Sequence, residues 1–535
     1  MHDQREHVLP PTVAEGDIDS FSSDRRRFLE AGLAVGAAGL LVPRAFAQAA
    51  APKRGGVLKL AVPSAARRLD PAIHGANEEF IISGAIFDNL VRVDPKLNPQ
   101  PGLASDWKVA PDGRSWTFNL RRGVKFHHGR EFTSKDVEFT IRRLLDPATA
   151  SMGRSLFGLV HNIETPNPYT ITFDLTDPYA DFPMMFGAVY ARILPFDAAT
   201  EVAKTPIGTG PFKMKEFVPA DHVTMVRNAD YWERDAAGNP LPYVDEFRQV
   251  TIPEQAAQIA ALTSGFIHIL WEAPPTAIAT LKADPNVKVL ETPSPGYHEI
   301  TIWVDVAPWK DVRVMQALKL SLDRDQLIKA ALGGYGTPSN DNPISSISPF
   351  WADTGMKKRD VAKAKALMTE AGYGNGVDVE LVTTNERAGL VEFAVGVKEM
   401  SAPAGFRIDI KTVPYDVYTA RYNRKHPFNM QNWNGRPTID EALYPYFHSK
   451  GSYKELYHFN NPEVDKLLDD GRKEADFQKR KAMYGRVQKI LADSGPVVIP
   501  YHRPYMAALH KGVQGYEIHP IRWADVRRVW LTGDA

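Results

Sequence analysis

Two adjacent histidines, His127 and His128, are the first side chains in this sequence that suggest metal chemistry. Imidazole nitrogens are frequent zinc ligands. Neighbouring residues on a strand point to opposite faces, however, so both rings cannot easily reach one ion. The chain has no His-Glu-x-x-His motif and no cysteine, which excludes thiolate-bound zinc, iron–sulfur clusters and thiol nucleophiles. We therefore expect no metal site and no cofactor.

The short motifs of hydrolases and nucleotide-binding proteins are also missing. No Gly-x-Ser-x-Gly motif occurs, so a serine hydrolase is not expected. The glycine-rich run 372–376, Gly-Tyr-Gly-Asn-Gly, lacks the Gly-x-Gly-x-x-Gly spacing and follows a helical pattern instead of opening one. It is more typical of a helix C-terminus followed by a turn. We expect that the protein is not an enzyme.

The chain of 535 residues contains 64 basic and 64 acidic side chains, and 44% of its residues are hydrophobic. This balance provides no basic excess for binding nucleic acid or an anionic membrane. The length is too great for one hydrophobic core, so we expect about two or three domains. No long apolar run follows the N-terminal region, so no membrane-spanning helix is expected there.

Residues 1–47 show the order of regions that is typical of a secretory signal. The basic run 24–30, Asp-Arg-Arg-Arg-Phe-Leu-Glu, resembles a twin-arginine signal and departs from it at its first and last residues. The apolar stretch Ala31–Val42 would form a helix of about 18 Å, too short to span a bilayer. A buried N-terminal helix is the alternative. We expect export to the periplasm as a soluble protein, without a cysteine-linked lipid anchor.

The run 102–145 carries the clearest local signals of structure. Alternating apolar residues over 116–120 predict a strand, and the alternation resumes over 124–126 after a break. Thr133 and Asp136 have the spacing of a capping box, which predicts a helix beginning there. No residue of this run has the pattern of a catalytic group.

This run closely resembles the signature of the family 5 extracellular solute-binding proteins, the dipeptide, oligopeptide and nickel receptors of bacterial ABC importers. Four further segments resemble landmarks of the same family: 53–62, Leu69–Pro71, Pro206–Phe212 and Pro308–Leu318. The resemblance implies an α/β, two-lobed periplasmic-binding-protein (Venus flytrap) fold with an extra subdomain inserted in the first lobe. It also implies a protein that binds and delivers a solute.

The resemblance implies the following division of the chain: a signal peptide over 1–47; lobe 1 over 53–85, 206–298 and 499–535; the inserted subdomain over 86–205; and lobe 2 over 299–498. The two crossings between the lobes are expected near 297–304 and 499–505. The ligand is expected in the cleft between the lobes, where small-molecule sites commonly occur.

In peptide-binding relatives, a Trp is followed three residues later by an Asp that holds the peptide amine. Here Trp433 is followed at that spacing by Arg436, although other family members also carry Gly-Arg-Pro at this point. A guanidinium suits a carboxylate or phosphate. We expect Arg436 to hold an acidic group of the ligand and Trp433 to form a flat apolar wall. The alternative is a structural ion pair between Arg436 and Asp440.

Weaker candidates for the ligand site follow from their expected places near the cleft: Asn434, Asp440, Trp271, Glu272, Tyr297, Trp303, His74 and Asn77. Each of these also has a plain interpretation as a packing residue or a polar loop residue.

The expected function is capture of a small peptide or peptide-like solute bearing a carboxylate, and its delivery to an ABC permease in the inner membrane. The same architecture could instead bind an opine, a sugar, an aromatic acid or a nickel complex, and a periplasmic chaperone or sensor role stays open. We expect a monomer that binds no nucleic acid.

Overall fold

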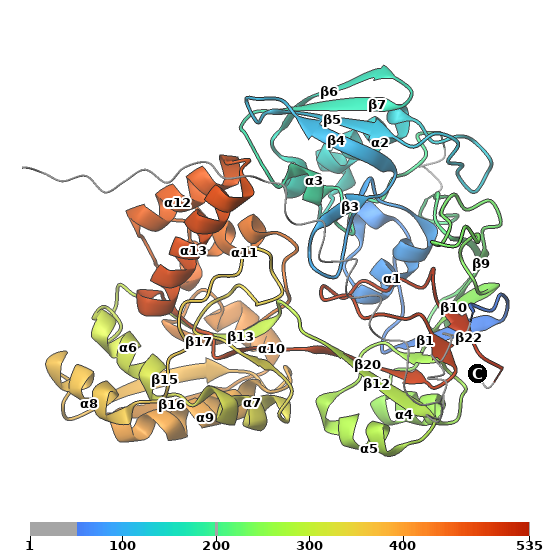
Figure 1. Cartoon of the computed structure of the whole chain (residues 1–535). Coiled ribbons are helices and arrows are strands. Elements are labelled where there is room, and N and C mark those ends of the chain that lie inside the picture. Colours follow the sequence, from blue (N-terminus) through green and yellow to red (C-terminus); the bar gives the residue numbers. More distant parts are fainter. Residues whose placement is uncertain (1–50, 198–201, 534–535) are drawn as a thin grey trace, which may run out of the picture. The chain divides into compact units, whose positions relative to one another are not determined.

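The computed structural model describes residues 51–197 and 202–533, so the predicted signal peptide lies outside the described residues. Figure 1 shows the arrangement of the helices and strands. Residues 52–535 cluster as one unit by their contacts. Within the described residues, no helix is both long and apolar enough to cross a membrane.

Lobe 1 is built on a seven-stranded sheet in the order β12-β20-β11-β1-β10-β9-β8. The strands are β1 (Val57–Val62), β8 (Phe212–Val218), β9 (His222–Arg227), β10 (Glu246–Thr251), β11 (Ile269–Leu270), β12 (Val287–Thr292) and β20 (Tyr505–His510). The central strand β1 runs parallel to both neighbours, and the outer strands pair antiparallel. One face packs on α1 (Asn77–Ile86), and the other packs on α4 (Gln255–Thr263) and α5 (Ile278–Ala283). A sheet covered on both faces explains the apolar run of β1.

The inserted subdomain has its own antiparallel sheet in the order β4-β5-β7-β6 and its own aromatic core. Its elements are β4 (Ala104–Val109), β5 (Ser115–Leu120), β6 (Val160–Asn167), β7 (Thr170–Leu175), α2 (Ser134–Leu145) and α3 (Phe182–Met185), with the hairpin β2 (Val91–Val93) and β3 (Pro99–Pro101) beside it. The predicted strand over 116–120 is confirmed. The predicted continuation over 124–126 is wrong: Val124 and Phe126 are buried, but this segment forms only an isolated bridge between Lys125 and Glu131.

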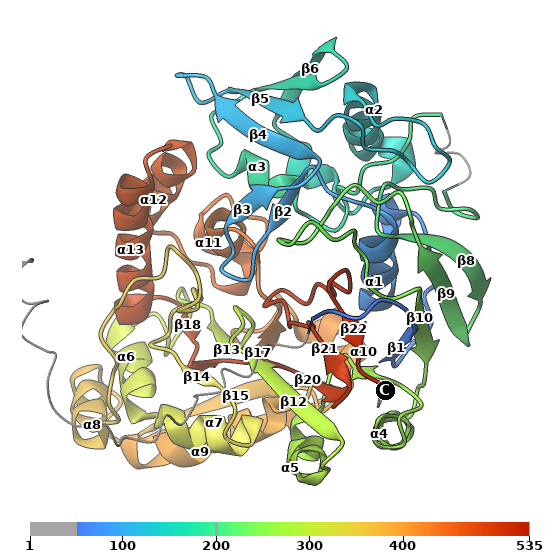
Figure 2. The same ribbon diagram turned by 45° about the vertical axis from the view of Figure 1, so that its right-hand side comes forward.

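Lobe 2 contains a second seven-stranded sheet in the order β14-β19-β13-β17-β15-β16, with β18 also paired to β13. Its strands are β13 (Tyr297–Ile302), β14 (Thr337–Pro338), β15 (Val377–Thr383), β16 (Phe406–Thr412), β17 (Phe428–Trp433), β18 (Val497–Val498) and β19 (Tyr501–His502). The helices α6 (Val312–Ser321), α7 (Arg324–Leu332), α8 (Val361–Glu370) and α9 (Leu390–Ser401) share one core with the sheet. A second core includes residues of α11 (Ile439–Phe447), α12 (Pro462–Lys473) and α13 (Phe477–Ser494), three helices that are labelled in Figure 2.

The strand pairing moves the expected lobe boundaries by a few residues. Tyr297 already pairs with Trp433 in the lobe 2 sheet, and β18 and β19 over 497–502 belong to the same sheet. The crossings are therefore 293–296 and 503–504. They lie side by side, because the Arg503 N–H donates to the Gly296 carbonyl at 2.7 Å and the Ser294 hydroxyl donates to the Arg503 carbonyl at 2.5 Å.

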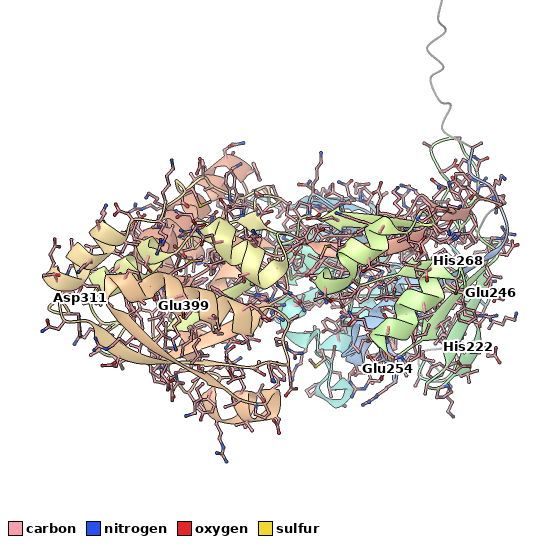
Figure 3. The ribbon with its side chains drawn as sticks, turned by 90° about the horizontal axis from the view of Figure 1, so that it is seen from below. His222, Glu246, Glu254, His268, Asp311 and Glu399 are labelled. Carbon is pink, nitrogen blue, oxygen red and sulfur yellow. The ribbon has the colours of Figure 1, made fainter. Side chains whose placement is uncertain are left out.

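Helix N-termini follow the local signals of the sequence. Thr133 and Asp136 form the predicted capping box at the start of α2. Asp311, labelled in Figure 3, accepts a hydrogen bond from the Arg313 N–H at 2.9 Å and caps α6. Asn461 caps α12 with Pro462 in its first turn. These caps satisfy helix N–H groups that have no intrahelical partner, so they fix where each helix begins.

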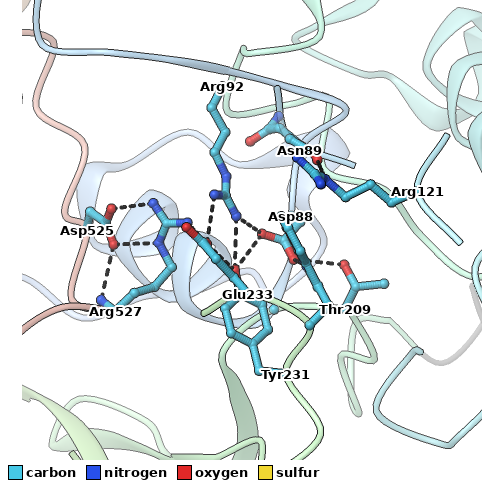
Figure 4. A network of polar contacts seen from close by, with 12 residues as sticks. Asp88, Asn89, Arg92, Arg121, Thr209, Tyr231, Glu233, Asp525 and Arg527 are labelled. Carbon is cyan, nitrogen blue, oxygen red and sulfur yellow. Dashed lines mark hydrogen bonds and ion pairs between the residues drawn. The ribbon is translucent and has the colours of Figure 1, made fainter. Parts of the chain in front are cut away.

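A polar network joins the segment after α1, the β2–β3 hairpin, residues 231–233 and the C-terminal segment (Figure 4). Arg92 donates to Asp88 at 2.9 Å and to Glu233 at 2.8 Å. Tyr231 donates to Asp88, and Arg527 pairs with Glu233. These paired charges connect distant segments of the first lobe.

Candidate functional site

The candidate site is built where β13 and β17 meet the crossings. Tyr297 is the first residue of β13, Trp433 is the last of β17, and the two are paired across the ladder. Antiparallel pairing therefore brings residues that are far apart in sequence to the edge of lobe 2 that faces lobe 1. The Arg503 guanidinium also donates to the Trp433 carbonyl at 3.0 Å, which ties the second crossing to this strand end.

A buried carboxyl group holds the Trp433 ring. The indole N–H of Trp433 donates to Oε1 of Glu299 at 2.5 Å, and the Tyr457 hydroxyl donates to the same oxygen at 3.0 Å. Glu299 is fully buried. Burial raises its pKa to about 7, and the two hydrogen bonds oppose this rise. Tyr446 and Tyr453 pack edge-on against the indole, so these contacts and the hydrogen bond to Glu299 together orient the Trp433 ring.

Arg436 follows on the loop between β17 and α11. Gly435 lets this loop pass directly over the first crossing, because a Cβ there would lie 2.0 Å from Cγ of Pro295. Nη2 of Arg436 donates to the Tyr446 hydroxyl at 2.9 Å. Among the described residues, Arg436 forms no ion pair with an acidic side chain. A guanidinium carries five N–H donors, so most of its hydrogen-bonding capacity is unused by the protein.

A small pocket surrounds these residues, which we call the Arg436 pocket. Its lining includes Pro295, Tyr297, Ile344, Trp433, Asn434, Arg436 and Tyr446. Tyr190 of the inserted subdomain is close enough to interact: burial raises the pKa of its hydroxyl, and the charge of Arg436 counteracts that rise. The structure thus brings Trp433, Asn434, Arg436 and Tyr297 together around one pocket, and their ligand role stays a prediction.

Trp271 and Glu272 line a second pocket beside the crossings, which we call the crossing pocket. It is formed from lobe 1 by Trp271, Tyr505 and Arg522, from the crossing by Arg503, and from lobe 2 by Leu332 and Tyr335. Glu272 pairs with Arg522 at 2.7 Å. Residues of both lobes therefore meet here, which places Trp271 and Glu272 at the interlobe cleft.

Other candidates lie away from these pockets. Asp440 is buried and pairs with Arg472 at 3.0 Å, so the alternative ion pair with Arg436 is not what the structure shows. Trp303 follows the opposite end of β13 from Tyr297, about 20 Å along the strand, and stacks on His458. That distance from the strand end corrects the prediction that Trp303 faces the cleft.

The first-lobe candidates sit at the start of α1. His74 is fully buried and neither ring nitrogen has a hydrogen-bond partner among the described residues; burial lowers its pKa to about 4. Its ring lies near Phe80, which packs edge-on against Tyr190. Asn77 is the first residue of α1. Neither residue lines the two pockets, and a ligand role for them stays a prediction.

Sequence reasoning missed Glu299, Tyr446, Arg503 and Arg522. Glu299 sits in a strand that is buried along its whole length, where a carboxylate is an unusual core residue. Arg503 directly precedes Pro504 within the second crossing, yet its partner Trp433 is set by tertiary pairing. No local pattern identifies Tyr446 or Arg522.

The adjacent histidines have separate surroundings. Nδ1 of His127 accepts from the Gly208 N–H, and its Nε2 donates to the Gly210 carbonyl at 3.0 Å. His128 instead faces Asp197 at 3.6 Å. Across the described ranges 51–197 and 202–533, no group of three or more His, Asp or Glu side chains is arranged to hold a metal ion.

Two α/β lobes joined by adjacent crossings, with pockets beside them, define the class of two-lobed solute-binding proteins. The chain belongs to the bacterial extracellular solute-binding proteins, family 5, whose middle region matches residues 98–454. The predicted family and fold are therefore confirmed.

Named relatives are similar over most of their length. The oligopeptide-binding protein AppA of Bacillus subtilis is 26% identical over 84% of this chain and 87% of its own. Heme-binding protein A of Haemophilus influenzae is 27% identical over 81% of this chain and 84% of its own. Among solved structures, the periplasmic murein tripeptide-binding protein MppA in its unliganded open form covers 90% of this chain and 98% of its own, at 23% identity and a TM-score of 0.79. AppA in complex with a nonapeptide covers 90% and 100%, at 25% identity and a TM-score of 0.69.

Proposed function

We propose that this protein captures a small solute with an acidic group, a peptide or peptide-like acid, between its lobes and delivers it to an ABC permease in the inner membrane. It acts as a monomeric receptor without catalytic turnover, exported to the periplasm and free of a cysteine-linked lipid anchor. AppA, which is named for binding oligopeptides, supports the ligand class, and family membership supports the permease partner.

One observation carries the proposal: Arg436 lines a pocket at the interlobe edge and donates to a neutral hydroxyl, with no acidic partner among the described residues. The Arg436 side chain is half-buried, and Glu441 acts on its charge from nearby without forming an ion pair, so a ligand carboxylate would be its first direct acidic partner. A carboxylate matches the planar fork of the guanidinium and can accept two parallel hydrogen bonds. Trp433, held by Glu299, offers a flat apolar surface beside it.

Capture occurs by rotation of the lobes about the two crossings. The adjacent crossings 293–296 and 503–504 are short, which suits a hinge. Closure is then stabilised by the contacts that the ligand makes only in the closed form.

Thermal unfolding with matched ligand pairs tests the acid preference. We would compare dipeptides bearing a free C-terminal carboxylate, such as Ala-Phe, with their C-terminal amides. The acids should raise the melting temperature and the amides should not, because ligands that bind only the folded state stabilise it. Arg436→Met should remove the difference, whereas Arg421→Met, which removes an exposed charge of the same lobe outside the pocket, should keep it.

Equal shifts by acids and amides in the unsubstituted protein would contradict the acid anchor. Turnover of any bound compound would contradict the receptor role. Mass spectrometry of the solute released when the purified protein is denatured would identify the natural ligand and show whether it carries an acidic group.

A further inference from the structure

A larger cavity, which we call the interlobe chamber, lies between the inserted subdomain and lobe 2. Its walls are mainly apolar and aromatic, and they include Trp107, Trp116 and Met184 from the subdomain and Phe350, Phe477 and Ile439 from lobe 2. The cavity volume is about 250 Å³. An apolar cavity of roughly 150 Å³ is enough to hold benzene. The chamber therefore accommodates an aromatic ring together with several further atoms.

The chamber adjoins the Arg436 pocket. The two cavities share five lining residues: Leu97, Ser348, Pro437, Thr438 and Ile439. Pro437 directly follows Arg436 in the chain, so the wall that the cavities share begins beside Arg436. We therefore expect a ligand whose acidic group lies on Arg436 to extend toward the chamber.

Two polar atoms of residues that line the chamber are buried within its wall. The indole N–H of Trp116 and Oδ2 of Asp181 have no hydrogen-bond partner among the described residues, and neither atom is accessible from the chamber. The surface that the chamber offers to a ligand is therefore mainly apolar, with Asn98, Ser348 and Thr438 as its uncharged polar residues.

The charge of the chamber is already balanced. The other oxygen of Asp181 pairs with Arg480 at 2.8 Å, and both side chains of this pair are buried. A ligand bringing a second charge into the chamber would find no free counter-charge and would lose its hydration. The chamber therefore selects against ligands that are charged at both ends.

We infer that the interlobe chamber is a second ligand subsite, which takes the uncharged aromatic or branched apolar end of the solute whose acidic group is bound by Arg436. This role depends on the proposed function, because Arg436 supplies the anchor from which the ligand extends. It narrows the ligand class to acids with an apolar body, and disfavours sugars and peptides with charged side chains at that end.

Indole-3-butyrate and butyrate are probes that share an acidic group and differ in the ring. Calorimetry should show indole-3-butyrate binding at least about tenfold more tightly than butyrate, since burying a ring removes a large apolar area from water. Ala475→Trp places a large side chain at the exposed rim of the chamber, between α12 and α13. This variant should bind indole-3-butyrate roughly 10- to 100-fold more weakly and butyrate unchanged.

A second variant removes part of the wall and has a matched control. Phe477 lines the chamber and is 41% exposed, whereas Phe266 is 55% exposed on lobe 1 and lines no part of it. Phe477→Ala should weaken indole-3-butyrate binding several-fold, and Phe266→Ala should not change it. Circular dichroism and thermal unfolding would establish that each variant is folded.

The outcomes separate the two proposals. If Ala475→Trp and Phe477→Ala leave indole-3-butyrate binding unchanged while Arg436→Met weakens it, the chamber is not a subsite and the acid anchor stands. If Arg436→Met also has no effect, both proposals are overturned. Absence of any saturable binding of indole-3-butyrate to the unsubstituted protein would overturn the chamber as a subsite for aromatic acids.

Discussion

The indole N–H of Trp433 donates to the buried carboxyl group of Glu299 at 2.5 Å, although the two residues are 134 positions apart in the chain. Glu299 is fully buried, and no cation pairs with it among the described residues. The contact links the wall of the Arg436 pocket to a group whose pKa lies at about 7. Protonation of Glu299 is therefore expected to influence stability near neutral pH.

The free energy of unfolding should fall as the pH rises from 4.5 to about 7, because Glu299 loses its proton over this range. The pKa of this carboxyl group is raised from 4.5 to about 7 on folding, so the folded state holds its proton more tightly than the unfolded state does. The resulting stabilisation is fully present below pH 4.5 and is lost as the pH rises to about 7. The loss amounts to about 3 kcal/mol in the free energy of unfolding.

Glu299→Gln provides the control, because the amide keeps an acceptor for Trp433 and Tyr457 and does not titrate. Chemical denaturation of both proteins between pH 4 and about 8 would measure the difference between their free energies of unfolding. We expect this difference to shift in favour of the variant as the pH rises. Parallel curves across that range would contradict the raised pKa.

Trp433→Phe should weaken both the fold and ligand binding. The substitution removes the indole N–H and leaves Oε1 of Glu299 with the Tyr457 hydroxyl as its partner. Loss of a partner for a buried acceptor costs about 1–3 kcal/mol. Trp351→Phe, at a position 38% exposed, serves as the control and should change stability by less than about 0.5 kcal/mol. Equal effects of the two substitutions on thermal unfolding would argue against the Glu299 contact.

Local signals predicted much of the secondary structure. Thr133 was expected to begin a helix, and it is an N-cap in the structure, as are Asp311, Asp360 and Asn461. An N-cap acts on N–H groups one to three residues away, so the information lies within one short segment. The family resemblance supplied the lobes, which no local pattern defines.

Features that depend on pairing between distant segments were predicted less well. The crossings were misplaced by a few residues because the register of β13 is set by β17 and β19. Asp440 was considered as a partner for Arg436, but Arg472 on α12 reaches it instead. Trp303 was placed near the cleft because it lies close in sequence to a hinge, yet it follows the far end of β13.

Gly435→Ala should disturb the position of Arg436. The new Cβ would meet Pro295 of the first crossing at 2.0 Å, so the loop or the crossing must move. We expect a loss of about 1–3 kcal/mol of stability and weaker binding of acidic ligands. Gly374→Ala is the matched control, because its Cβ would only reach ordinary contact with Thr369 at 3.5 Å. Thermal unfolding and ligand titration of both variants would show whether the close approach matters.

The ion pair between Asp181 and Arg480 should be important because it is buried between the subdomain and α13. Asp181→Ala leaves a buried guanidinium without its partner and should cost about 3–5 kcal/mol. The exposed pair Glu463–Arg486 has a similar separation, 2.7 Å, and Glu463→Ala should cost much less stability than Asp181→Ala, because solvent screens an exposed pair. Denaturant titration of both variants would measure the loss in the free energy of unfolding that each substitution causes. Similar costs for the two variants would mean that the interlobe pair is effectively solvated.

The most direct test of the acid anchor is a crystal structure of the protein purified with its natural solute. We expect the solute between the lobes, with an oxygen of its acidic group about 2.7–3.0 Å from the guanidinium nitrogens of Arg436. A solute bound elsewhere, or one in the cleft that leaves Arg436 bonded to Tyr446 without an acidic partner, would contradict the proposed function.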